Sequence, residues 1–192
     1  ILSIIFSLAL FTACPGSSYE KETGIILSHL TLEQRVGQMM MPAIPGTSMN
    51  PELEKTISAM KPGGVILFGY NIASRDQLRS FIAGIQSLSL KGGLPMFISV
   101  DQEGGRVVRV VDGVTQFPGA MAAGVCGREE LTRAWGRILG MELRGLGINM
   151  NFAPVLDVNN NPANPVINTR SFGPDPATVA ILGAAYIEGL QE

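Results

Sequence analysis

Cysteine and histidine are almost absent from this sequence, which has two cysteines and one histidine among 192 residues. So few thiol and imidazole ligands argue against a zinc site of the Cys and His type, and we expect no metal and no cofactor. Cys126 has no histidine next to it, so we predict that it fills space in the core rather than acting as a nucleophile. The single His29 precedes the first predicted strand, and we expect it on the surface.

Charged residues are also scarce. They make up 16% of the chain, against 46% hydrophobic residues, and the net charge is −2. This composition argues against disorder and predicts one domain with a buried core. Because the sequence has no basic run and no interleaving of basic and aromatic residues, we expect no nucleic acid as a partner.

A hydrophobic run long enough to cross a membrane is missing. Residues 1–13 are uncharged and mostly apolar, but they are too few to span a bilayer and are typical of the apolar part of a signal peptide. The small residues before Cys14 resemble a bacterial lipoprotein cleavage site, at which the cysteine becomes lipidated. We therefore predict a signal-peptide remnant at 1–13, lipidation of Cys14 and a tether over 14–24.

These N-terminal features predict an exported bacterial protein, lipid-anchored and facing the periplasm or the cell surface. Contact with the membrane would then occur only through the anchor. The alternative is ordinary secretion, with Cys14 as an incidental thiol.

Four short apolar runs are predicted to be strands, and they are nearly continuous rather than alternating. Such runs are typical of parallel strands that are covered on both faces. The four runs are residues 38–43, 64–68, 95–100 and 148–158.

A helical pattern follows each of these runs. Asn50-Pro51 and Asp175-Pro176 each offer an N-cap and a proline in the first turn, and Ser74 with Gln77 forms a capping box. Residues 129–146 keep apolar side chains at helical spacing. A further capping box, Thr31 with Gln34, predicts a short helix before the first strand.

The alternation of strand and helix predicts an α/β fold with a parallel sheet. Four such units are half of a (β/α)₈ barrel of the TIM type, which needs about 250 residues. We predict the N-terminal half of such a barrel over 25–192, truncated after about the fourth unit and continuing beyond 192. A doubly wound open sheet would also accommodate four units.

Polar residues follow the predicted strands, at the end where a barrel carries its active site. Asn71 follows the second strand, residues 101–106 follow the third, and Asp157 and Arg170 follow the fourth. Carboxylates accept hydrogen bonds from sugar hydroxyls and arginine donates them, so this set favours a carbohydrate pocket. The glycine pair 104–105 would let the backbone approach a bound ring, and it lacks the spacing of a nucleotide-binding loop.

The segment from Val100 to Arg109 resembles the signature of family 3 glycoside hydrolases, in the β-N-acetylglucosaminidase branch. Further similar segments extend along most of the chain. They are residues 63–68, 151–158, 164–167 and 170–173. The resemblance implies that Asp101 binds hydroxyls of the non-reducing-end sugar, that Arg109 lines the same subsite and that Arg170 also contacts substrate.

Structural roles remain open for each of these residues: Asp101 as a strand-end carboxylate, Arg109 in a salt bridge and Arg170 as a clamp on its loop. Three other charged residues, Glu103, Arg106 and Asp157, are predicted to be structural. Glu103 and Arg106 could pair across the glycine turn, and Asp157 could anchor the loop that follows it.

The resemblance also implies a retaining hydrolase that removes terminal β-linked N-acetylglucosamine, or another N-acetylhexosamine, from cell-wall or chitin-derived saccharides. Its nucleophile, an Asp, and its acid/base, a His, are expected after Glu192, so no catalytic residue is assigned here and the chain alone is expected to be inactive. The alternatives are a family 3 β-glucosidase and a non-catalytic, lipid-anchored sugar-binding protein. The resemblance does not decide whether water or phosphate accepts the sugar.

Overall fold

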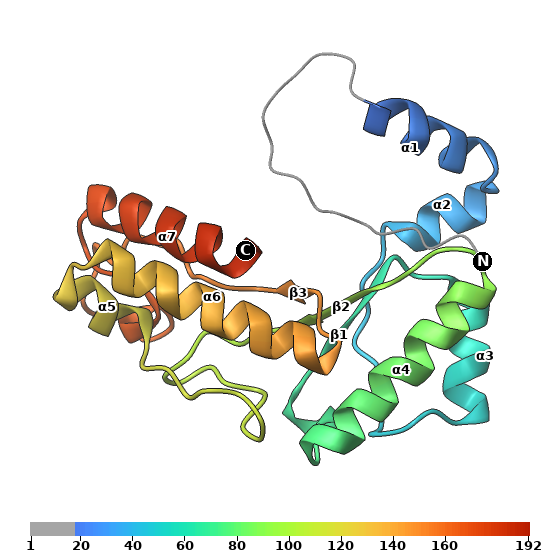
Figure 1. Cartoon of the computed structure of the whole chain (residues 1–192), viewed down its shortest axis with the longest axis horizontal. Coiled ribbons are helices and arrows are strands. Elements are labelled where there is room, and N and C mark those ends of the chain that lie inside the picture. Colours follow the sequence, from blue (N-terminus) through green and yellow to red (C-terminus); the bar gives the residue numbers. More distant parts are fainter. Residues whose placement is uncertain (1–17) are drawn as a thin grey trace.

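The computed structural model describes residues 18–192, in which helices alternate with short strands (Figure 1). The predicted signal-peptide remnant and Cys14 lie outside the described residues. The elements are α1 Ser18–Ser28, α2 Leu32–Gln38, α3 Pro51–Met60, β1 Gly64–Leu67, η1 Gly69–Asn71, α4 Arg75–Lys91, β2 Phe97–Val100, α5 Ala120–Cys126, α6 Glu129–Leu146, β3 Met150–Asn151, η2 Asn168–Arg170 and α7 Pro176–Gln191.

The three strands form a parallel sheet in the order β1-β2-β3. On the other side of β1, Ala43 forms an isolated parallel bridge with Ile66. Each strand is therefore added at the same edge as the chain proceeds, as in a barrel. In a doubly wound sheet the direction of addition would reverse. The predicted α/β class with a parallel sheet is confirmed.

Two of the four predicted strands are much shorter than the sequence suggested. Within 38–43, α2 continues to Gln38 and only Ala43 bridges to the sheet. Within 148–158, the strand is limited to Met150–Asn151, with one further bond from the Phe152 amide to the Val100 carbonyl. Pro154 has no amide hydrogen to donate, so the ladder cannot continue through it.

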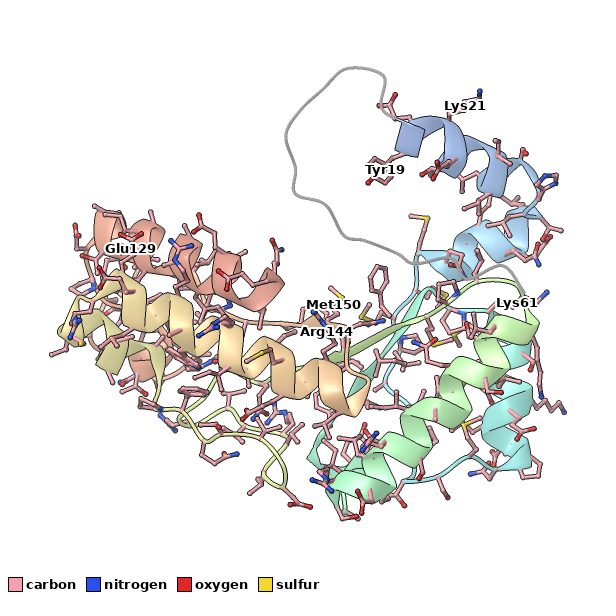
Figure 2. The ribbon with its side chains drawn as sticks, viewed as in Figure 1. Tyr19, Lys21, Lys61, Glu129, Arg144 and Met150 are labelled. Atoms are coloured by element: carbon pink, nitrogen blue, oxygen red, sulfur yellow. The ribbon has the colours of Figure 1, made fainter. Side chains whose placement is uncertain are left out.

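The predicted helix starts are confirmed. Side chains of Thr31, Asn50, Ser74 and Asp175 each accept a hydrogen bond from an amide of the first turn of α2, α3, α4 and α7. Helix α6 has the predicted bounds, and Figure 2 shows Glu129 at its start and Arg144 near its end. This placement is favourable for the helix dipole.

Two α-helices and the two short 3₁₀ helices η1 and η2 were not predicted. Helix α1 covers part of the segment predicted to be a tether, and its side chains from Tyr19 to Ser28 are exposed (Tyr19 and Lys21 in Figure 2). Helix α5 is seven residues long, and its N-cap Gly119 offers no side-chain signal. The free Cys126 at its end is exposed, so the prediction that it fills the core is wrong.

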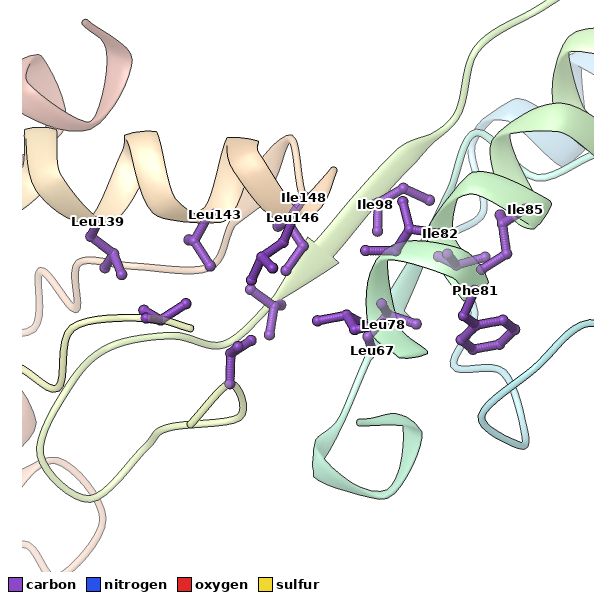
Figure 3. Close-up of a cluster of buried hydrophobic side chains, with 14 of the residues drawn as sticks. Leu67, Leu78, Phe81, Ile82, Ile85, Ile98, Leu139, Leu143, Leu146 and Ile148 are labelled. Atoms are coloured by element: carbon purple, nitrogen blue, oxygen red, sulfur yellow. The ribbon is translucent and has the colours of Figure 1, made fainter. Parts of the chain in front are cut away.

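The core lies between the sheet and helices α4 and α6 (Figure 3). Leu78 and Ile85 of α4 are fully buried together with the strand residues Leu67 and Ile98. Helix α6 contributes further buried side chains, among them Leu143 and Leu146, and Figure 3 shows Leu146 beside the strand. Burying these side chains fixes both helices against the strands and so fixes where the strand ends lie.

Helices α6 and α7 approach each other closely. A Cβ atom on Gly136 would overlap the main-chain oxygen of Tyr186, and one on Gly140 would lie 2.5 Å from that of Leu190. Beside these glycines, the rings of Trp135 and Tyr186 meet edge to face with centroids 5.0 Å apart. The helix spacing is therefore set by backbone contact at glycine.

Candidate functional site

The carboxyl ends of β1 and β2 carry the polar residues from which the site is built. After β1, Asn71 is fully buried, and its side-chain amide donates to the carbonyls of Ile44 and Gly46. Its Oδ1 accepts from the Phe68 amide at 2.9 Å. Asn71 thereby ties the loop after β1 to the segment before it and fixes Phe68.

Asp101, the first residue after β2, pairs with Arg109. Arg109 Nη2 donates to Asp101 Oδ2 at 3.2 Å, and the side chains are 30% and 22% exposed. The guanidinium also lies over the Phe68 ring, 5.7 Å from its centre. Two of the three residues predicted to contact sugar are thus adjacent, and both remain accessible to a ligand.

Arg170, the third of these residues, is held by Glu103. Its Nε and Nη2 donate to the two carboxylate oxygens of Glu103 at 2.8 and 2.7 Å. This hydrogen bonding raises the pKa of Arg170, with smaller contributions from the carboxylates of Asp157 and Asp101. The predicted pairing of Glu103 with Arg106 is wrong, because Glu103 pairs with a residue 67 positions away.

The glycine pair packs against protein. Gly104 and Gly105 have φ angles of +89° and +58°, which favour glycine. A Cβ on Gly104 would lie 2.6 Å from the Pro118 carbonyl oxygen, and one on Gly105 would lie 2.7 Å from the Gly119 nitrogen. The space that we predicted for a bound ring is thus filled by residues 117–119, and the pair serves to close this turn.

The loop after β3 is anchored through its main chain. The Ser171 hydroxyl donates to the carbonyl of Asp157, while Asp157 itself is exposed. The predicted anchoring at Asp157 therefore involves its carbonyl rather than its carboxylate. Tyr186 of α7 is fully buried, and burial together with the negative charge of Glu103 raises the pKa of its phenol.

Sequence reasoning missed Gln102 and Asn151, two amide side chains that organise the site. The Asn151 amide bonds both main-chain groups of Gln102, accepting from its N–H at 2.9 Å and donating to its carbonyl at 3.0 Å. It thereby joins the ends of β2 and β3. Both residues lie in segments that we had identified as motifs, but nothing in their spacing indicated which partner each would bind.

Other features lie away from this site. One cavity of about 430 Å³ lies between residues 42–46 and α3, and another of about 320 Å³ is lined by parts of α2, α3 and α4.

His29 is exposed on the segment after α1, as predicted. Residues 18–192 contain no group of three or more His, Cys, Asp or Glu side chains placed to hold a metal ion. Over the same residues, every helix is too short or too polar to cross a membrane.

The chain is thus an α/β protein whose polar site lies at the carboxyl ends of its parallel strands. The sequence profile of the glycosyl hydrolase family 3 N-terminal domain matches residues 31–192, and the chain belongs to this family.

Named relatives agree with this assignment. Beta-hexosaminidase A of Pseudoalteromonas piscicida is 43% identical over 152 residues, covering 76% of this chain and 25% of that protein. A beta-N-acetylglucosaminidase/beta-glucosidase of Cellulomonas fimi is 33% identical over 165 residues, covering 86% and 28%. The structure of a family 3 β-N-acetylglucosaminidase from Paenibacillus sp. str. FPU-7 matches with a TM-score of 0.81 and 45% identity, covering 84% and 31%.

The chain therefore spans about a quarter to a third of the length of these three proteins. The structural match supports the parallel α/β fold described above, since both sequence and backbone agree over most of the chain.

Proposed function

We propose that this chain supplies part of the sugar-binding site of a retaining β-N-acetylhexosaminidase. The enzyme would remove terminal β-linked N-acetylglucosamine from cell-wall or chitin-derived saccharides, without a cofactor. The observation that carries the proposal is the Asp101–Arg109 pair, which is accessible at the carboxyl end of the sheet in a family 3 domain. The names of the relatives, a beta-hexosaminidase and a β-N-acetylglucosaminidase, support the choice of sugar.

Asp101 has the acceptor capacity that such a site needs. Arg109 occupies one of its oxygens, so the other oxygen can accept hydrogen bonds from sugar hydroxyls. Arg109 in turn uses one donor for this pair, while its guanidinium has five N–H groups in total. The two side chains together could bind neighbouring hydroxyls of one ring.

Arg170 has less capacity left. Glu103 occupies its Nε and Nη2, and its Nη1 donates to the Val166 carbonyl at 3.3 Å. Contact with sugar through its remaining hydrogens stays a prediction, beside the clamp role in which Arg170 holds its own loop to Glu103.

Replacement of Asp101 by Asn tests the binding role, in the protein produced from the whole gene. Losing the charge from two hydrogen bonds of about 1.5–3 kcal/mol each should lower kcat/KM on 4-nitrophenyl N-acetyl-β-glucosaminide by about a hundredfold or more. The matched control is Asp76→Asn, an 81% exposed carboxylate on α4, which should leave kcat/KM within about twofold. Equal activity of D101N and wild type would refute the role.

The β-glucosidase alternative is kept because the Cellulomonas fimi relative carries both activities in its name. Assaying the 4-nitrophenyl glucoside beside the N-acetylglucosaminide separates the two. A preference for the glucoside would replace the proposal. Binding of N-acetylglucosamine without turnover of either compound would favour a non-catalytic sugar-binding protein.

We also propose export with a lipid anchor on Cys14, from the lipoprotein-like segment described above. Cys14→Ser should abolish incorporation of a labelled fatty acid and release the protein from the membrane fraction, while Cys126→Ser should change neither. A wild-type protein that incorporates no labelled fatty acid and lies outside the membrane fraction would instead support ordinary secretion.

A further inference from the structure

Gln102 is buried, with 2% of its surface exposed, and its side chain binds the main chain of the loop that carries Arg109. Its Oε1 accepts from the amides of Arg109 and Val110 at 2.8 and 2.9 Å. Its Nε2 donates to the Val110 carbonyl at 2.8 Å. The side-chain amide thus makes three bonds, all to Arg109 and the residue after it.

The Arg109 side chain, by contrast, is held weakly. It makes one bond to Asp101 and lies over the Phe68 ring, and its Nε is buried without a hydrogen-bond partner in the described part of the chain. The position of its guanidinium therefore depends on where its main chain is fixed, and Gln102 fixes it.

The main chain of Gln102 is itself fixed by the Asn151 amide from the end of β3. Gln102 also directly follows Asp101. Gln102 is therefore linked to both members of the pair: to Asp101 through the peptide bond and to Arg109 through its side-chain hydrogen bond. These two links set the distance between Asp101 and Arg109.

We propose that Gln102 is a positioning residue for the sugar subsite, acting through the backbone of Arg109. The inference deepens the proposed function and rests on it. Without the three hydrogen bonds, the 107–110 segment would move away from Asp101, and the two side chains would no longer meet the same ring. A positioning error of this kind reduces binding in the ground state and the transition state alike, so KM should rise more than kcat falls.

The test is Gln102→Met, a substitution of similar shape without hydrogen bonds, made in the protein produced from the whole gene. We expect kcat/KM on 4-nitrophenyl N-acetyl-β-glucosaminide to fall about tenfold, mostly through KM. The matched control is Gln116→Met. Gln116 binds carbonyls of the same loop, at Val110, Val111 and Val114, but does not bond the Arg109 amide. The control should keep KM within about twofold of wild type.

A double-mutant cycle with Arg109→Met separates positioning from a general loss of stability. If Gln102 acts through Arg109, the double variant should be no worse than Arg109→Met alone. Multiplicative losses, or a kcat/KM of Gln102→Met within twofold of wild type, would overturn the inference. If Gln102→Met does not fold, Gln102→Asn replaces it, since that side chain keeps the amide and is shorter by one methylene group.

Hydrogen exchange decides the inference even if the protein hydrolyses neither substrate. The amides of Arg109 and Val110 should exchange at least about tenfold faster in Gln102→Met and unchanged in Gln116→Met, because within residues 18–192 Gln102 is their sole acceptor. Protected amides in Gln102→Met would overturn the inference. If the wild-type protein hydrolyses neither substrate but Gln102→Met still speeds exchange of these two amides, the proposed function is refuted and the role of Gln102 in holding the Arg109 main chain stands.

Discussion

The geometry of the Glu103–Arg170 pair predicts how much unfolding free energy is lost when the pair is broken. Both carboxylate oxygens of Glu103 accept from Arg170, the Glu103 side chain is 7% exposed and that of Arg170 is 27% exposed. Breaking a fully buried pair costs about 3–5 kcal/mol, but water can reach part of Arg170, so we expect about 2–3 kcal/mol for Glu103→Gln. For a chain of this size the loss corresponds to a Tm lower by about 4–12 °C.

Unfolding in urea and on heating can be followed by the fluorescence of Trp135, the only tryptophan, which is buried against Phe117 and Tyr186. The control is Glu129→Gln, which removes an exposed partner 3.5 Å from Arg133 and should cost less than about 0.5 kcal/mol. The reasoning is refuted if the two variants lose equal stability.

Three further predictions follow from single positions. Gly104→Ala should cost more than about 2 kcal/mol of unfolding free energy in urea, because its φ of +89° and the Pro118 oxygen at 2.6 Å leave no place for a methyl group. Gly145→Ala, in the last turn of α6 with nothing within 4 Å of the new atom, should instead raise Tm, because alanine stabilises a helix relative to glycine by up to about 1 kcal/mol. For Tyr186, burial and the charge of Glu103 raise the pKa of the phenol in the folded state above its unfolded value of about 10. The stabilisation of the folded state by the neutral phenol is therefore fully present below pH 10 and is lost as the pH rises above it. Urea midpoints between pH 9 and 11 should therefore fall less steeply in Tyr186→Phe than in the wild type, and parallel slopes would contradict this.

The fold could be predicted where local signals suffice. Caps such as those at Asn50 and Ser74 act within one helical turn, so the sequence contains both partners of each hydrogen bond. Helix α5 has no such signal, because its cap is a glycine. The positions of the strands were predicted, but the predicted strands were too long. An apolar run indicates that a segment is buried, whereas the length of a strand depends on how far its backbone can form hydrogen bonds with the adjacent strand.

The site could be predicted in part. Resemblance to a known family indicated Asp101 and Arg109, and the structure brings them together at 3.2 Å. The partner of Glu103 could not be found from local sequence, because the residue that binds it is 67 positions away and depends on how the loop after β3 returns. A nearby arginine, Arg106, offered a plausible but wrong alternative.

The glycine contacts between α6 and α7 have a consequence for how this protein can change over evolutionary time. Where side chains fill an interface, a larger residue on one helix can be offset by a smaller one on the other. At Gly136 and Gly140 the opposing atoms are main-chain oxygens, which no substitution can shrink. The helix pair should therefore tolerate variation on its outer faces while these two positions stay fixed. Tyr186, whose phenol is close enough to Glu103 to feel its charge, belongs to the same contact, so sequence change elsewhere in the two helices should leave Tyr186 in place beside Glu103.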